Sequence, residues 1–122
     1  MPIIITQGTA GGVGYIDVRM DPGKGEVHQT LLDVTALAGS KDAAGYLPPG
    51  LPILAAGGPV TGAGQTAKYV LGPNPWKVPG ANQFGNVLYP QTLNRDAVED
   101  NLGRALSADE VSALAAGGFR FV

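Results

Sequence analysis

The residues best spaced for chemistry lie near the amino terminus, where Ile3-Ile4-Ile5 precedes Gly8, Gly11 and Gly14. An apolar strand followed by spaced glycines is typical of a dinucleotide-binding loop, whose next helix presents its N-terminal amides to the pyrophosphate. Here the following residues alternate in polarity as in a strand and soon reach Pro22, so no such helix follows. The sequence favours a glycine hinge over a nucleotide site.

His28 is the only histidine, and the chain has no cysteine. A catalytic histidine needs a nucleophile or a carboxylate as partner. The nearest candidate, Asp33, is five positions on, which in a strand lies on the opposite face. We therefore interpret His28 as a surface or interface residue, and a metal site built on histidine or cysteine is excluded beyond one ligand.

Two adjacent acidic pairs, Glu99-Asp100 and Asp109-Glu110, could in principle do acid–base work. Both fall in segments with helical signals, where capping and solvent exposure already account for them. Residues 62–68 contain Gly, Thr and Lys, but in the wrong order for a phosphate loop. The sequence therefore predicts no catalytic residue, no cofactor and no metal, and hence a protein that is not an enzyme.

Composition indicates a folded, loop-rich β protein. The chain has 122 residues, of which 44% are hydrophobic and 15% charged, with 19 glycines and 10 prolines to form turns. The net charge of -2, without any basic run, argues against nucleic-acid binding. No signal peptide is visible and the apolar runs are too short to span a bilayer, so we expect a soluble protein without a membrane partner.

Alternating and turn-forming residues predict a hairpin in the first third of the chain. One strand is expected at residues 14–20, a turn at 21–25 and a second strand at 26–34. Residues 36–45 are small, polar and weakly patterned, and predict a loop. We therefore divide the chain into an N-terminal arm with a β-hairpin at residues 1–45 and a body at residues 46–122.

The body is expected to begin with short strands and to end with two helices and a strand. Asn94 and Gly103 predict the start and end of the first helix, and Ser107 with Glu110 forms the capping-box pattern of the second. The resulting fold class is α+β, β-rich and loop-rich, a small compact body of short strands with two short C-terminal helices and an N-terminal arm or hairpin. Strands are expected at residues 51–54, 68–71, 84–89 and 119–122.

Aromatic residues outside the expected core could anchor a partner. Trp76 lies in a stretch rich in Pro and Gly, and such side chains on loops often anchor interfaces. It could equally fold back as a lid on the core. The predicted interface residues are Trp76, Tyr89 and Phe119.

Three segments of the chain resemble the lambda-type bacteriophage head decoration proteins. Residues 86–90, Asn-Val-Leu-Tyr-Pro, resemble the strand that precedes the helical part of that family. Residues 115–122, Ala-Ala-Gly-Gly-Phe-Arg-Phe-Val, resemble its last helix end, glycine turn and final strand. Residues 51–54 and 68–70, separated by glycines, resemble its first body strands.

This resemblance implies a capsid-stabilising cement protein of the virion. Such proteins are homotrimers without catalytic residues, which bind the major capsid protein at three-fold sites outside the expanded icosahedral head. The implied location is the capsid exterior, and the host cytoplasm during assembly. In the family an arm before the body becomes ordered on the capsid, a role that fits the β-branched segment Pro2, Ile3, Ile4, Ile5 and Thr6.

Two other functions remain open from the residues alone. A small β-rich phage or cell-surface module could bind carbohydrate, with Trp76 and either Tyr69 or Tyr89 stacking on the sugar. An enzyme is the third hypothesis, and His28 would be its first candidate residue.

Overall fold

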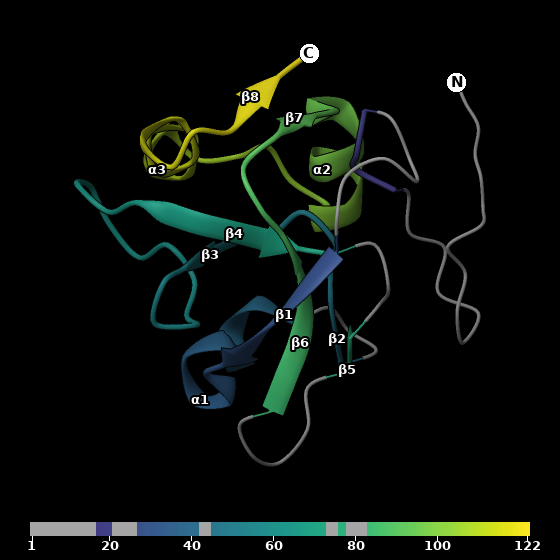
Figure 1. Cartoon of the computed structure of the whole chain (residues 1–122), viewed down its shortest axis with the longest axis vertical. Helices are drawn as coiled ribbons and strands as arrows, with labels where there is room; N and C mark the ends of the chain where they lie inside the picture. Colours follow the sequence, from purple (N-terminus) through teal and green to yellow (C-terminus); the bar gives the residue numbers. More distant parts are fainter. Residues whose placement is uncertain (1–16, 21–26, 42–44, 73–75, 78–82) are drawn as a thin grey trace.

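A four-stranded antiparallel sheet with strand order β1-β6-β4-β3 forms the centre of the structure (Figure 1). The structure is a computed structural model that describes residues 17–20, 27–41, 45–72, 76–77 and 83–122. Short strands and loops predominate and the helices are short, so the predicted α+β class is confirmed. The strands of the central sheet are β1 (Val27–Leu32), β3 (Pro52–Leu54), β4 (Ala67–Leu71) and β6 (Gln83–Leu88).

Strand β1 pairs with β6 along its whole length, from Val27 opposite Leu88 to Leu32 opposite Gln83. The strand predicted at residues 26–34 is thus confirmed. The predicted hairpin with the strand at residues 14–20 is wrong for the described residues, because β1 pairs with β6. Arg19, from the other half of that hairpin, forms an isolated bridge with Leu93 instead. Partner choice in a sheet depends on tertiary packing, which alternation along one strand does not encode.

A short helix, α1 (Val34–Leu37), and a 3₁₀ turn (Ala38–Ser40) follow β1, where the sequence predicts a loop from residue 36. The side chain of Asp33 caps α1 by accepting from the backbone N–H of Ala36 at 3.1 Å. Leu37 is fully buried in the same cluster as residues of the body. Thus β1 and α1, which precede the predicted boundary at residue 45, share a sheet and a core with the elements that follow it.

The two C-terminal helices, α2 (Arg95–Leu102) and α3 (Ala108–Ala116), are confirmed together with their caps. Asn94 accepts from the N–H of Ala97, and Gly103 ends α2 with a φ of 74°, which favours glycine. Ser107 and Glu110 form both bonds of the capping box. These signals are local, which explains why they could be predicted.

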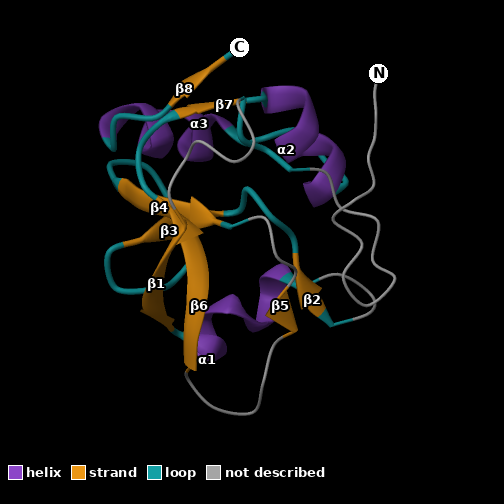
Figure 2. Ribbon diagram, turned by 45° about the vertical axis from the view of Figure 1, so that its right-hand side comes forward, coloured by secondary structure: helices purple, strands orange, loops and turns teal. Residues whose placement is uncertain are grey.

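Two small strand pairs flank the central sheet. Strand β7 (Thr92–Leu93) pairs in parallel with the C-terminal β8 (Arg120–Phe121), and β2 (Tyr46–Leu47) pairs with β5 (Trp76–Lys77). Figure 2 shows β7, β8, α2 and α3 on one side of the sheet and α1 on the other.

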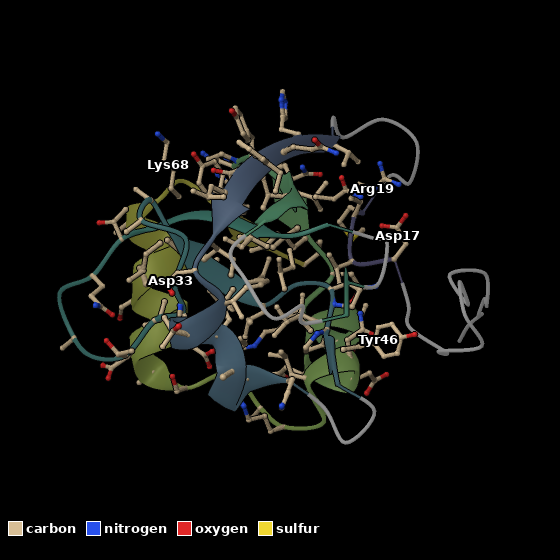
Figure 3. All side chains as sticks on the ribbon, turned by 90° about the horizontal axis from the view of Figure 1, so that it is seen from below. Asp17, Arg19, Asp33, Tyr46 and Lys68 are labelled. Carbon is tan, nitrogen blue, oxygen red and sulfur yellow. The ribbon has the colours of Figure 1, made fainter. Side chains whose placement is uncertain are left out.

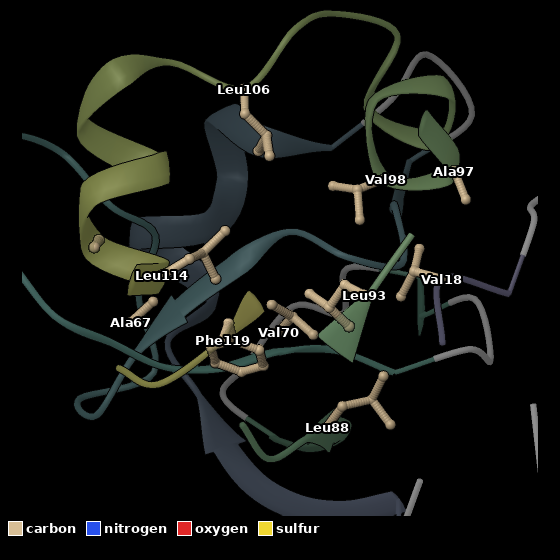
Figure 4. Packing of buried hydrophobic residues seen from close by; sticks show 11 residues of the cluster. Val18, Ala67, Val70, Leu88, Leu93, Ala97, Val98, Leu106, Leu114 and Phe119 are labelled. Atoms are coloured by element: carbon tan, nitrogen blue, oxygen red, sulfur yellow. The ribbon is translucent and has the colours of Figure 1, made fainter. Parts of the chain in front are cut away.

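Apolar side chains fill both faces of the sheet. Neighbouring positions of one strand point to opposite faces, so Leu88 belongs to the cluster beneath α2 and α3, and Val87 to the cluster beside α1. Figure 4 shows the first cluster, in which Leu114, Val98 and Phe119 pack towards Val70. The second cluster contains Leu32, Leu37, Leu47, Leu51, Ile53, Tyr69, Leu71 and Val87.

Candidate functional site

The predicted site residues do not gather at one place. The predicted capsid-binding segment, Pro2 to Thr6, lies outside the described residues. Trp76 is in β5, opposite Leu47 of β2, and its side chain is also outside the description. Tyr89 follows β6 directly and is 45% exposed, so part of this residue is accessible to a partner.

Phe119 is a core residue, and its prediction as an interface residue is wrong. It is 4% exposed and packs in the cluster beneath α2 and α3. The glycine turn before it, with Gly118 at a φ of 96°, returns the chain over the sheet and points the ring inwards. An aromatic side chain with so little surface cannot anchor a partner in this fold.

The largest exposed apolar side chains of the central sheet lie on one face of β1 and β6. Leu31 and Phe84 are directly opposite each other in the register, yet they are 49% and 65% exposed. Residues opposite each other in an antiparallel pair share a face, so these side chains form one continuous apolar surface. We call this surface the ribbon face and define it by Val27, Gln29, Leu31, Phe84 and Asn86.

The ribbon face lacks charge and lies beyond the helices. None of the residues of β1 and β6 is Asp, Glu, Lys or Arg. Gln29 and Asn86 lie opposite each other, and their side chains are bonded at 3.4 Å between Nε2 and Oδ1. Helix α3 packs against β4 and β3, and α1 lies on the other face of the sheet, so no described helix lies over the ribbon face at the far end of the β1–β6 pair (Figures 1 and 2).

A row of rings runs from β1 past the end of β6 to β4. The ring of His28 in β1 stacks on that of Tyr89, with centroids 3.8 Å apart and planes inclined by 17°. Tyr69 of β4 lies on Tyr89 at 5.5 Å with a tilt of 42°. One face of Tyr89 is therefore covered by His28, and Tyr69 is buried, so a sugar could stack on little of this group.

The carboxylates of the helical part have structural partners. Glu110 is buried, and its two oxygens accept from Nη1 and Nη2 of Arg104 at 2.7 and 3.0 Å. Oε1 also accepts from the N–H of Ser107 at 2.9 Å. Burial would raise the pKa of Glu110, but the hydrogen bonds from Arg104 and Ser107 outweigh it and keep that pKa below 4.5.

Glu99 holds the other end of the turn between α2 and α3. Its Oε2 accepts from the backbone N–H of Leu106 at 2.9 Å and from Nε of Arg95 at 3.2 Å. The Leu106 N–H is the main cause of a lowered pKa, with Arg95 adding to it. Each of the two acidic pairs thus supplies one carboxylate that accepts a hydrogen bond from a backbone N–H. Glu99 accepts from Leu106, and Glu110 accepts from Ser107.

Asp17 and Arg19 form a third ion pair, in which the two side chains lie side by side (Figure 3). Nη2 of Arg19 is 2.7 Å from Oδ2 of Asp17. The hydrogen bond from Arg19 to this carboxylate raises the pKa of the guanidinium, which keeps it charged. The pair supports the chain beside β7, because Arg19 bridges Leu93.

Three of the exposed large apolar side chains in the part of the chain that the structure describes, Val27, Leu31 and Phe84, lie on the ribbon face. Within that part of the chain, no group of three or more His, Cys, Asp or Glu side chains could hold a metal ion. None of its helices is long and apolar enough to cross a membrane. The ribbon face is therefore the best candidate for a functional surface that the structure describes.

The sequence analysis does not predict Leu31 or Phe84 as exposed contact residues, although the sequence contains a pattern that indicates apolar side chains on both faces of these strands. Leu31-Leu32 and Val87-Leu88 are consecutive apolar residues in strands, and such pairs place one side chain on each face. Both faces of the sheet near residue 88 are covered, whereas near residue 31 only one is. Which of the two leucines remains exposed depends on where the helices end.

No family model matches the chain, and no significantly similar curated protein or solved structure was found.

Proposed function

We propose that this chain is a structural protein of a phage head. In this proposal it binds the outside of the icosahedral capsid as a homotrimer at three-fold sites and stabilises the expanded head. The observation that carries the proposal is the ribbon face, an exposed and uncharged apolar surface on a sheet. Apolar patches of this kind mark contacts with other proteins.

The resemblance to lambda-type decoration proteins supports the same function. The three similar segments correspond to regular elements of the body: residues 51–54 and 68–70 fall in β3 and β4, residues 86–90 end β6, and residues 115–122 span the end of α3 and β8. These elements pack in the two clusters on the faces of one sheet, so the similar segments are parts of one packed unit.

A cement protein needs complementary surface and many copies instead of an active site. On a capsid lattice each contact is repeated, so modest affinity per contact gives a large total stabilisation. The carboxylates with lowered pKa values bind backbone amides and arginines, which is consistent with a structural role. The partner is the major capsid protein, and the segment Pro2 to Thr6 is the proposed capsid contact.

Binding to heads tests the proposal. Purified protein is mixed with unexpanded and with expanded empty heads, and the bound protein is measured after sedimentation. We expect saturable binding to expanded heads, in multiples of three copies, and greater resistance of those heads to heat. A variant that lacks residues 2–6 should fold normally but bind heads weakly. Failure of the full chain to bind expanded heads would contradict the proposed function.

Carbohydrate binding is the second candidate, for which Tyr89 offers only the part of its ring that His28 leaves exposed. A glycan array probed with the wild-type chain and with Trp76→Ala and Tyr89→Ala separates the two functions. Binding to a sugar that both substitutions abolish, without binding to heads, would favour the second candidate.

A further inference from the structure

We infer that the ribbon face is the surface through which copies of this chain meet around their symmetry axis. The partner is thus a second copy of the chain, and the contact is centred on Leu31 and Phe84. This inference deepens the proposed function and rests on it for the number of copies, three.

Charge is the first argument for a second copy. Residues beside a rotation axis meet their own copies, so any charge there faces a like charge, which is unfavourable. The strands β1 and β6 contain no charged residue, whereas α2 and α3 carry Arg95, Asp96, Glu99, Asp100, Asp109 and Glu110. The absence of charge on β1 and β6 is what a contact between identical surfaces needs, whereas a partner of different sequence could have compensated charges here.

The geometry of the ribbon face suits a compact apolar contact. Phe84 is the most exposed large apolar residue of the sheet among those described, and Leu31 lies directly opposite it. Val27 is on the same face but at the other end of the pair, beyond Gln29 and Asn86. The register between β1 and β6 is regular over all their residues, so the surface contains no bulge. An aromatic residue with aliphatic neighbours is typical of the centre of an interface, where a few residues supply most of the binding energy.

Amide groups beside the apolar centre add polar contacts without charge. Gln29 and Asn86 already bond to each other, and each amide retains further donors and acceptors. These groups can bond to copies of themselves, because an amide carries both a donor and an acceptor. The ribbon face is therefore compatible with itself in polarity as well as in charge.

The opposite edge of the sheet is built differently. Strand β3 contains Pro52, its register with β4 shifts between Ile53 and Leu54, and Ile53 bridges to Pro59. Prolines and bulges are devices that block the addition of another strand. This edge is thus protected from association, and we place the contact on the β1–β6 side.

Sedimentation velocity in the absence of heads tests the inference. The variants are Phe84→Asp, Leu31→Asp and the conservative Phe84→Leu. Val122→Asp is the matched control, because Val122 is 69% exposed but lies in the C-terminal segment, beyond β8 and away from the start of β6 (Figure 1). Circular dichroism melts establish that each variant folds.

We expect the wild type, Phe84→Leu and Val122→Asp to sediment as trimers. Phe84→Asp and Leu31→Asp should be folded monomers at concentrations at least tenfold above the wild-type dissociation constant. A wild-type chain that stays monomeric at high concentration, or aspartate variants that remain trimers, would overturn the inference. If Phe84→Asp forms trimers that still bind heads, the proposed contact at the ribbon face is wrong but the proposed function stands. If the wild type forms trimers that fail to bind heads, the proposed function is wrong but the contact stands.

Discussion

Gly117, at the end of α3, lies directly against the backbone carbonyl of Ala67 in β4. A β-carbon at position 117 would overlap the carbonyl oxygen of Ala67. The φ of Gly117 is -81°, which any residue adopts, so close approach and not backbone conformation requires glycine here. This contact brings the last turn of α3 onto the central sheet.

Replacing Gly117 by alanine should therefore lower the free energy of unfolding by about 1–3 kcal/mol, the usual cost of overpacking. Gly39→Ala is the control, since a β-carbon there meets nothing within 4 Å. Its stability should stay the same or rise by up to about 1 kcal/mol, because alanine restricts the unfolded chain. Urea unfolding followed by circular dichroism measures both, and equal effects would contradict the close contact.

Phe119→Ala should destabilise the protein by about 3–5 kcal/mol, because it removes a buried ring from the core beneath α2 and α3. Phe121→Ala, in which the ring is only partly buried, should cost clearly less. Thermal melts compare the two. A Phe119→Ala protein of wild-type stability that has lost its self-association would restore the interface prediction.

Ser107→Ala should cost about 1 kcal/mol, the typical value of an N-cap. The substitution removes the acceptor of the Glu110 N–H, which Oγ of Ser107 binds at 3.1 Å. Ser112→Ala, at an exposed position of the same helix, is the matched control and should leave the unfolding midpoint almost unchanged. A cost at Ser112 as large as that at Ser107 would mean that general helix propensity, not the cap, is being measured.

Stability should fall in acid, because Glu110 and Glu99 have lower pKa values in the folded protein than their ordinary value of 4.5. The unfolded chain then takes up protons first, so their stabilising effect is complete above pH 4.5 and is lost as the pH falls through the folded-state pKa values. Unfolding midpoints at pH 7, 5, 4 and 3 would measure this decline.

Glu110→Gln should flatten that decline and lower the stability at pH 7 by about 1.5–3 kcal/mol, the range for hydrogen bonds to a charged group. Asp109→Asn is the control, because Asp109 is exposed and adjacent in α3. Its pH profile should follow the wild type. A Glu110→Gln profile as steep as that of the wild type would show that other groups control the acid sensitivity.

Much of the helical part of this protein could be predicted because its signals act over three or four residues. The caps at Asn94 and Ser107 each bind an N–H three positions on, and Gly103 ends α2 through its own φ. The alternation around Arg120 likewise predicts that Phe119 and Phe121 share one side of the C-terminal segment, but it does not indicate which side is buried. By contrast, the cap at Asp33 could not be predicted, because the helix that it starts has only four residues.

The partners of the strands could not be predicted, since they join segments that are far apart in the chain. Gln29 bonds to Asn86 across 57 positions, and no pattern in residues 27–32 specifies β6 over a nearer strand. The exposure of Leu31 and Phe84 has the same origin, because it depends on how far the helices extend over the sheet.

The sequence by itself thus determined the class of the fold, the two capped helices and the absence of a familiar catalytic motif, all of which follow from composition or from neighbouring residues. Only the tertiary structure decided that Phe119 is core and that Leu31 meets Phe84 on an uncovered face. Burial depends on how all the elements pack together, so the side chains that stay accessible to partners can be identified only in the complete fold.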